Sequence, residues 1–276
     1  MTDLNALLGI GREAVEQGVA LLRTAQATHV IAKGDRDMVS DLDLTIERRT
    51  RARLRQATPG AGFLGEEEGQ HGSADHTWVL DPIDGTANFL RGLPLCGISL
   101  ALIREGRPVL GIVALPFLSR TYWAGEGLGA WQDQQRIAPS ATPAIGEAIV
   151  AVGDYAFGTT AAYRNPIIHA LHRHLADRAQ RVRMLGSAAV DLAWVADGTL
   201  DASITIGNNV WDMTAGLAIA REAGARVVDL DGTAHTADSA ATIAIAPNVA
   251  AELLELIQHA ALGSRFVPVE EGRAEC

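Results

Sequence analysis

The sequence predicts a mixed fold, α+β in its first half and α/β in its second, on the basis of three observations. Residues 3–26 have the apolar periodicity of an amphipathic helix. Three apolar segments between residues 97 and 125 are separated by short turns, a spacing typical of an antiparallel meander. From residue 148 onwards, strand-like and helix-like segments alternate, as they do in α/β proteins.

The pattern changes at residues 138–146, which are rich in proline, alanine and hydroxyl-bearing residues. We interpret this segment as a linker. The predicted division is an N-terminal α+β half over residues 1–140 and a C-terminal α/β half over residues 141–265. A flexible tail is expected over residues 266–276.

The composition is that of a soluble globular protein, and the charge narrows the choice of partner. Apolar residues make up 48% of the chain, so a hydrophobic core can form. The formal net charge of −10 argues against broad binding to nucleic acid or to an anionic membrane. It also disfavours an anionic substrate, unless metal cations reverse the local charge. An acidic protein that handles phosphate would therefore require divalent cations.

The sequence favours a cytoplasmic protein. No apolar segment approaches the roughly 20 residues of a membrane span. Asp3 and the lack of an early basic region argue against a signal peptide. The cysteines, Cys96 and Cys276, are too few for a disulfide framework or a zinc site. We expect Cys96 to be a buried apolar residue.

A second helix is predicted after the first. Ser40 and Asp43 match the capping-box pattern S-x-x-D, which indicates a helix from residue 41 to about Gln56. Asp43 could alternatively be a first-turn carboxylate that the helix dipole favours.

Between these helices, residues 28–40 predict a polar loop that contains the charge-rich segment Lys33–Asp37. Such a segment is usually solvated and mobile. The alternative is a flap over an anionic site.

Three glutamates follow a short predicted strand at residues 62–65. Adjacent carboxylates repel one another, so Glu66, Glu67 and Glu68 alone indicate an exposed segment. Their position directly after an apolar stretch also allows them to be cation ligands.

The central segment, residues 78–89, places two aspartates near the end of a predicted strand. Its first apolar residues predict a short buried strand. We expect this strand to end at Asp81, because Pro82 fixes its own φ and restricts the residue before it. Asp81 and Asp84 then lie close together, and carboxylates bind hard cations such as Mg²⁺.

Gly85 and Thr86 follow and lead into a helical turn over residues 87–90. Free N–H groups at a helix start bind phosphate oxygens. A metal site that touches a phosphate site is what phosphoryl chemistry needs. The alternative is an ordinary surface turn, because Asp-Pro and Asp-Gly are common turn dipeptides.

The remaining elements follow from periodicity and turn residues. Strands are expected at 97–104, 108–115 and 120–125, and the glycine-rich segment 125–129 predicts a turn rather than a dinucleotide fingerprint. In the second half, strands are expected at 148–152, 182–185, 201–206, 226–229 and 242–246, and helices at 160–178, 187–196, 211–223 and 248–261. The histidines of the 160–178 helix, at positions 169, 172 and 174, have no evident carboxylate partner and predict a solvated face.

Taken together and in order, the motifs resemble those of the inositol monophosphatase family. The matching motifs are V-S-D-L-D at 39–43, G-E-E at 65–67, D-P-I-D-G-T at 81–86, G-S-A-A at 186–189 and W-D-M-T-A-G at 211–216. The resemblance extends from about Leu4 to Ala261. It implies the sugar-phosphatase fold, with alternating layers of helices and sheets and a metal site between the two halves.

The resemblance also implies a ligand set for two or three Mg²⁺ ions. Glu66, Asp81 and the backbone carbonyl of Ile83 correspond to ligands of the first ion. Asp81, Asp84 and Asp212 correspond to ligands of the second, and a weaker third ion relies on Glu66 through water. Most ligands thus lie in the N-terminal half, and Asp212 comes from the C-terminal half.

The same resemblance implies the reacting groups. Thr86, paired with Asp43, and Glu66 orient and deprotonate the attacking water. Glu67 supports the metal ligands. The residues that it places on phosphate and substrate are Gly85, Thr86, Ser187 and Asp212.

The substrate end departs from the family pattern. Inositol-specific members have a glutamate six residues before the tryptophan of the W-D motif, and here that position is Thr205. The expected reaction is hydrolysis of a small polyol or sugar phosphate, with inositol 1-phosphate as the first choice. Histidinol phosphate, another sugar phosphate or a nucleotide phosphate stay open.

Two classes of function compete, a phosphatase and a non-catalytic binding or regulatory protein on the same fold. A degenerate member should have lost ligands, and all of those in the motifs are present. We therefore expect an Mg²⁺-dependent phosphoric monoester hydrolase that acts on a small-molecule phosphate ester. The resemblance implies a homodimer, and the net charge and the lack of a long apolar segment lead us to expect neither nucleic acid nor membrane as partner.

Overall fold

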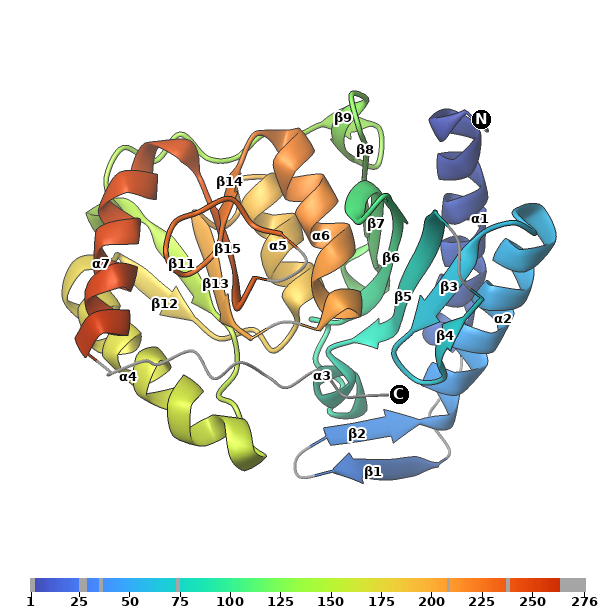
Figure 1. The fold of residues 1–276 in the computed structure, drawn as a ribbon, viewed down its shortest axis with the longest axis horizontal. Helices are drawn as coiled ribbons and strands as arrows, with labels where there is room; N and C mark the ends of the chain where they lie inside the picture. The colour runs from blue at the N-terminus through green and yellow to red at the C-terminus, as the bar shows by residue number, and fades with distance from the viewer. Residues whose placement is uncertain are drawn as a thin grey trace.

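Helices and sheets alternate through the molecule in five layers (Figure 1). The computed structural model describes residues 3–24, 29–34, 37–72, 75–207, 209–236 and 239–263. Across these residues the layers are a helix pair, an eight-stranded sheet, a second helix pair, a five-stranded sheet and a third helix pair. The predicted class of layered helices and sheets is confirmed.

The first helix pair consists of α1 (Leu4–Thr24) and α2 (Asp41–Ala57), as the sequence predicts. Ser40 begins α2 with a capping box. The Ser40 hydroxyl accepts a hydrogen bond from the Asp43 amide at 3.4 Å, and the Asp43 carboxylate accepts one from the Ser40 amide at 2.9 Å. Both helices pack their apolar sides on one face of the eight-stranded sheet, where Trp78 is fully buried.

The eight-stranded sheet has the order β10-β9-β8-β7-β6-β5-β3-β4. Its strands are β3 (Gly62–Gly65), β4 (Gly69–His71), β5 (His76–Asp84), β6 (Gly97–Arg104), β7 (Arg107–Leu115), β8 (Arg120–Gly125), β9 (Gly129–Gln132) and β10 (Gln135–Arg136). The predicted antiparallel meander is confirmed and runs from β5 to β10. β3 pairs parallel with β5, and Gly65 is opposite Leu80. This register places Glu66 beside Asp81.

The predicted end of the central strand at Asp81 is wrong, because β5 continues to Asp84. Asp81 pairs with Ser99 of β6 and Asp84 pairs with Gly97, with a shift of register between the two pairs. Pro82 has no N–H to donate, so the sheet accommodates it in this irregularity instead of ending. Both aspartates therefore belong to the end of an interior strand rather than to a turn.

The predicted loop over residues 28–40 is also wrong. This segment contains an antiparallel pair of strands, β1 (Val30–Gly34) and β2 (Asp37–Ser40). Apolar residues at the two ends of the segment, among them Ile31 and Val39, pair across the hairpin. The charged residues in the middle of the segment conceal this β pattern in the sequence.

Of the remaining predicted features, Cys96 can be examined, whereas others lie outside the described residues. Cys96 is fully buried, as expected, whereas Cys276 lies outside the described residues. The predicted tail over 266–276 also lies outside them, as does part of the predicted charged loop Lys33–Asp37.

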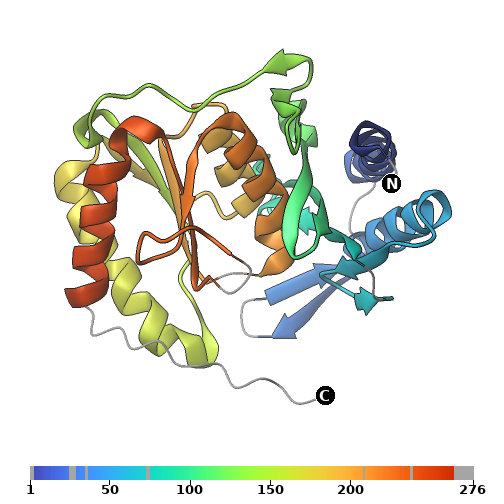
Figure 2. The same ribbon diagram turned by 45° about the horizontal axis from the view of Figure 1, so that its top comes forward.

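The second half follows the predicted alternation of strands and helices. Its elements are β11 (Ile149–Val152), α4 (Ala161–Arg178), β12 (Arg181–Arg183), α5 (Ala188–Ala196), β13 (Ala202–Ile206), α6 (Val210–Ala223), β14 (Arg226–Val228), β15 (Ala241–Ile245) and α7 (Ala250–Gly263). The sheet order is β12-β11-β13-β15-β14, with β11 parallel to β12 and β13 and with β15 antiparallel to its neighbours. Figure 2 shows the segment before β11 crossing from the first sheet to the second. None of the described helices is long and apolar enough to cross a lipid bilayer.

The core reflects the alternation of side chains along each strand. In β11, Val150 and Val152 pack toward α4 and α7, whereas Ala151 faces α5 and α6. The helices between the sheets lie very close to the strands. A Cβ atom at Gly111 of β7 would be 2.3 Å from the Ala215 carbonyl oxygen of α6. The small side chains on these faces thus let α5 and α6 join the two sheets, and the site lies at the end of this junction.

Candidate active site

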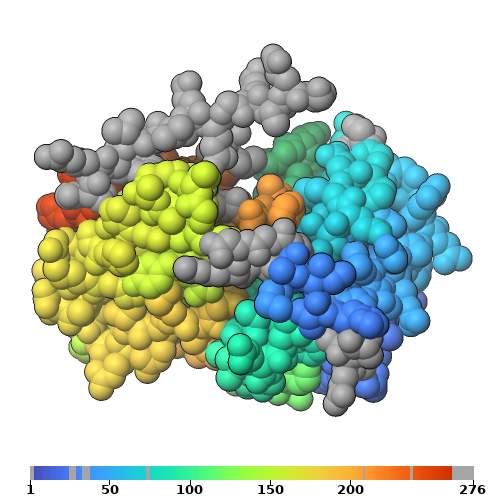
Figure 3. All heavy atoms as spheres, turned by 90° about the horizontal axis from the view of Figure 1, so that it is seen from below, coloured from blue at the N-terminus to red at the C-terminus, as the bar shows by residue number. Residues whose placement is uncertain are grey.

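A pocket of about 580 Å³ opens where the two sheets and the helices between them meet. One wall comes from the end of β5 and from α3 (Thr86–Leu90), and the other comes from α5, α6 and the segments after β11 and β13. In Figure 3 the β1–β2 hairpin, in blue, and α4, in yellow-green, flank a region where part of α6 is visible in orange. Met38 of β2 lines the pocket, so the hairpin contributes to its rim.

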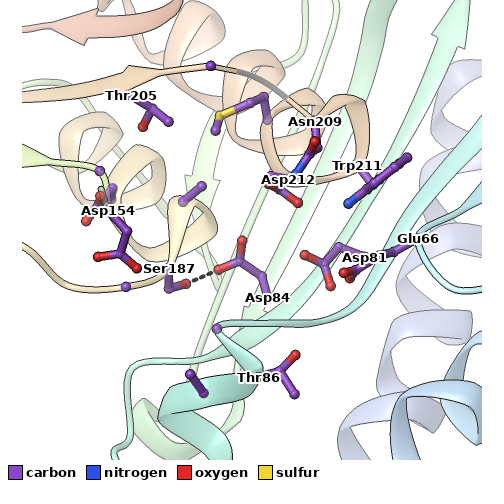
Figure 4. Close-up of a pocket in the computed structure, with 18 of the residues that line it drawn as sticks. Glu66, Asp81, Asp84, Thr86, Asp154, Ser187, Thr205, Asn209, Trp211 and Asp212 are labelled. Carbon is purple, nitrogen blue, oxygen red and sulfur yellow. Dashed lines mark hydrogen bonds between the residues drawn. The ribbon is translucent and has the colours of Figure 1, made fainter. Parts of the chain in front are cut away.

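Three carboxylates converge in this pocket (Figure 4). Asp81, Asp84 and Asp212 each present an oxygen within 4.8 Å of the others. Asp81 and Asp84 come from β5 and are buried, whereas Asp212 comes from the first turn of α6 and is half-buried. Glu66 lines the same pocket. The structure therefore brings together residues that the sequence separates by more than a hundred positions.

The electrostatics of this cluster favour protons or cations. Burial, followed by the charges of Glu66, Asp84 and Asp212, raises the pKa of Asp81 well above its usual range. Burial likewise raises the pKa of Asp84 to about 7. Like charges held out of water are unfavourable without a neutralising partner. All the donors are oxygen atoms, and this chemistry fits a hard divalent cation. The cluster can thus hold a metal ion.

Asp84 is fixed by the helix of the opposite half. The Ser187 hydroxyl donates a hydrogen bond to Asp84 Oδ1, and the amides of Ala188 and Ala189 at the start of α5 also lower the pKa of this carboxyl. Ser187 additionally accepts a hydrogen bond from the Val190 amide at 3.3 Å, as an N-cap does. The resemblance places Ser187 on phosphate or substrate, and in the structure the Asp84 carboxylate interacts with Ser187 and the start of α5.

Asp212 lies inside α6 and is not its N-cap. Asn209 occupies the N-cap position and donates a hydrogen bond from Nδ2 to Asp212 Oδ2 at 3.0 Å. Asp212 lies in the first helical turn, as acidic residues often do.

Thr86 links the end of β5 to α2. Its Oγ1 lies 2.9 Å from the Ile83 carbonyl oxygen and 3.3 Å from Asp43 Oδ1. Burial raises the pKa of Asp43, while hydrogen bonds from Ser40 oppose this shift. The predicted pair of Thr86 and Asp43 is thus in contact. Ile83 is buried at the pocket, and its carbonyl retains a second lone pair.

Gly85 is the residue that allows β5 to turn into α3. Its φ of +82° lies in the left-handed region. A Cβ atom there would lie 2.9 Å from the Leu95 carbonyl oxygen and 3.2 Å from the Gly186 carbonyl oxygen. Both the backbone conformation and the space around it therefore require glycine.

Comparison with known proteins supplies the family. The sequence pattern of the inositol monophosphatase family matches residues 4–262. This chain belongs to the inositol monophosphatase family. The predicted resemblance is confirmed, and with it an enzyme of the phosphoric monoester hydrolase class.

Several family members are similar along most of the chain. The inositol-1-monophosphatase ImpA of Mycolicibacterium smegmatis is 34% identical over 92% of this chain and 93% of its own length. The fructose-1,6-bisphosphatase/inositol-1-monophosphatase of Thermotoga maritima is 37% identical over 72% of this chain and 74% of its own length. Among solved structures, the IMPase of Thermotoga maritima superposes with a TM-score of 0.85 at 31% identity, covering 93% of this chain and 98% of that one.

Sequence reasoning missed Glu47, which holds the turn after β3. Glu47 is fully buried on α2, and its carboxylate accepts hydrogen bonds from the amides of Glu67 and Glu68, each at 2.9 Å. Burial raises the pKa of Glu47, and these two amides oppose the shift. Its position one turn after Asp43, on the buried face of a helix, is the signal that could have revealed it.

The three adjacent glutamates are half-buried rather than exposed, because they have different surroundings. Glu66 lines the pocket, and Glu68 lies 2.7 Å from both Arg48 and Arg51. The amide of Glu67 contributes to the turn, and its predicted supporting role stays a prediction.

Two further acidic residues of the pocket were not predicted. Asp154 follows β11 and Asp191 lies on α5, and both line the pocket outside the three-carboxylate cluster. Neither belongs to a recognisable local motif.

Proposed function

We propose that this chain is an Mg²⁺-dependent phosphomonoesterase that hydrolyses the phosphate ester of a small polyol, with inositol 1-phosphate as the first candidate. The observation that supports this most is the convergence of Asp81, Asp84 and Asp212 beside the contact between Thr86 and Asp43. A cation site next to a hydroxyl–carboxylate pair meets the needs of a water attack on phosphorus.

The residues present fit the metal that the family implies. Asp81, Asp84 and Asp212, with Glu66 and the Ile83 carbonyl, would hold two Mg²⁺ ions, and Glu66 would hold a third through water. When bound, the ions would neutralise charge on the phosphate and lower the pKa of water.

The chain itself would orient the reactants. Thr86 and Glu66 would hold the attacking water. Asp43, whose pKa burial raises, would be a better proton acceptor through Thr86 than an exposed aspartate is. The amides of Gly85 and Thr86 would hold the phosphate oxygens, and Ser187 would keep Asp84 in place.

Several alcohols are candidates for the part of the substrate that carries the phosphate. Two relatives have names that include inositol-1-monophosphatase, and one of these also includes fructose-1,6-bisphosphatase. Thr205 lines the pocket and offers a hydroxyl where inositol-specific members are expected to have a carboxylate. Histidinol phosphate and sugar phosphates are therefore the main competitors.

Phosphate release tests the proposal. Inositol 1-phosphate, histidinol phosphate, several sugar phosphates and adenosine 3′,5′-bisphosphate would be assayed with and without Mg²⁺. We expect Mg²⁺-dependent turnover with one clear preference. Asp84→Asn should abolish it, whereas Asp177→Asn, the same change of charge on the exposed part of α4, should not. A folded protein without turnover on any of these esters would overturn the proposal and favour a binding protein.

A homodimer and a cytoplasmic location remain predictions from the resemblance and the sequence. Sedimentation equilibrium of the full chain would test the first, and we expect twice the mass of 29.1 kDa. Fractionation of cells that produce the full chain would test the second.

A further inference from the structure

The C-terminal wall of the pocket contains a buried carboxylate that no described group satisfies. Asp191 lies on α5, one turn after Ser187, and is 2% exposed. It lines the pocket, and its Oδ1 has no hydrogen-bond partner among the described residues. A carboxylate oxygen in such a place is costly unless a ligand supplies a donor.

A second carboxylate lies on the same wall. Asp154 directly follows Gly153, whose amide donates to the Ile204 carbonyl at 2.9 Å, so Asp154 lies at the carboxyl end of the parallel strands β11 and β13. Ligands of α/β sheets bind at this end of the strands. Asp154 is exposed to the pocket and makes no hydrogen bond with another described residue. Figure 4 shows it across the pocket from Asp81, with Ser187 and Asp84 between them.

The charge of Asp154 acts on Asp191. The charges of Asp84 and Asp154 contribute to raising the pKa of Asp191, after the effect of burial. Asp154 is exposed, yet the surrounding pocket removes part of its water, and this raises its pKa. Arg164 lines the same pocket, and its guanidinium lies beside the backbone of Gly207. Asp154 and Asp191 thus form an acceptor-rich surface on this wall.

The chemistry of this surface selects its ligand. Carboxyl oxygens accept hydrogen bonds, so they match hydroxyl donors. We propose that Asp154 and Asp191 accept hydrogen bonds from two hydroxyls of the substrate's alcohol, so that this enzyme selects a polyol phosphate over an ester whose alcohol part has no hydroxyls. This inference rests on the proposed function, because the phosphate is taken to lie at Gly85 and Thr86.

The test compares two esters in the holoenzyme with Mg²⁺. Inositol 1-phosphate presents hydroxyls to the wall, whereas 4-nitrophenyl phosphate presents an aromatic ring without them. Asp154→Ala should raise KM for inositol 1-phosphate about tenfold, the usual effect of losing a hydrogen bond to a charged group. Both kcat and KM for 4-nitrophenyl phosphate should stay within twofold. Asp154→Asn keeps one acceptor, so its KM for inositol 1-phosphate should lie between those of wild type and Asp154→Ala.

The matched controls are Asp177→Ala, an exposed aspartate of α4 outside the pocket, and Asp191→Asn, with folding checked by Tm. Asp177→Ala should change neither kcat nor KM for either ester. Folded Asp191→Asn should discriminate between the esters in the same direction as Asp154→Ala. If Asp191→Asn does not fold, Asp154→Ala alone decides. An unchanged KM for inositol 1-phosphate, or an equal loss on both esters, would overturn the subsite.

Failure of the proposed function is distinguishable from failure of the subsite. If wild-type protein hydrolyses neither ester, the phosphatase proposal fails, and free inositol then tests the subsite by thermal shift. Stabilisation of wild type that Asp154→Ala abolishes would support the subsite. No difference between the two proteins would overturn it.

Discussion

The two walls of the pocket are built in opposite ways. On the N-terminal wall, Asp81 and Asp84 are buried at the end of a sheet and are held by backbone and side-chain hydrogen bonds. On the C-terminal wall, Asp154 follows a strand, is exposed and has no such bond among the described residues. The first wall is preorganised by these contacts, whereas Asp154 can be replaced without disturbing the sheets. Most of the proposed metal ligands thus lie on the N-terminal wall and are completed by Asp212, whereas the proposed hydroxyl acceptors lie on the C-terminal wall.

The largest expected loss of activity follows from a substitution on the N-terminal wall. Asp81→Asn removes a charge that the proposed metal site needs, and kcat should fall about 1,000-fold or more, equivalent to roughly 4 kcal/mol. The Tm of the metal-free protein should not fall, because the substitution removes a buried like charge. Steady-state kinetics and calorimetry of the same preparation measure both. A parallel loss of Tm and kcat would show that Asp81 is mainly structural.

A smaller effect is expected from the turn that begins α3. Gly85→Ala combines a left-handed φ with a clash against the Leu95 carbonyl. It should lower the free energy of unfolding by about 2 kcal/mol and kcat by about a hundredfold, because the amides that we propose hold the phosphate would move. Gly92→Ala is the control, since Gly92 has a φ of +73° but open space around its Cα. Equal effects of the two substitutions would show that crowding at Gly85 is irrelevant.

The next effect in size concerns stability and the turn at residues 66–68, which Glu47 holds behind the N-terminal wall. Glu47→Gln leaves one of the two amides of the 66–68 turn without a good acceptor, and the free energy of unfolding should fall by about 2 kcal/mol. Glu68→Gln, which weakens pairs with arginines near the surface, should cost under about 1 kcal/mol. Urea denaturation of the two variants makes the comparison. A larger loss for Glu68→Gln would contradict the assigned role of Glu47.

The smallest effect is a pH dependence. A protonated carboxyl cannot ligate a metal, and the pKa of Asp84 is raised to about 7. Mg²⁺ binding should therefore weaken as pH falls from 8 to 6, by at most about tenfold per pH unit for each proton displaced. Isothermal titration calorimetry at several pH values measures this slope. Asp84→Asn should flatten it, and a flat slope in wild type would contradict the raised pKa.

The same contrast between the walls explains what the sequence could predict. Asp81, Asp84, Gly85 and Thr86 lie within six residues, so one local motif reveals them. The capping box of Ser40 and the periodicity of the helices are also local, and they are confirmed.

The features that escaped prediction depend on contacts between distant segments. Glu47 acts on a turn about twenty residues further along, and its role exists only once β3 and α2 are packed together. Pro82 is tolerated because β6 pairs on both sides of it. The role proposed for Asp154 and Asp191 depends on the pocket that both residues line, and sequence periodicity cannot reveal this pocket.

The contact between Ser187 and Asp84 joins residues 103 positions apart in the chain. It can form only after both sheets and α5 are in place, and such distant contacts form late when a protein folds. A chain in which only the first sheet has folded would already present Asp81 and Asp84, yet it would lack both Ser187 and Asp212. During refolding, the recovery of secondary structure should therefore precede the recovery of turnover. Catalysis is then the last property that the chain acquires.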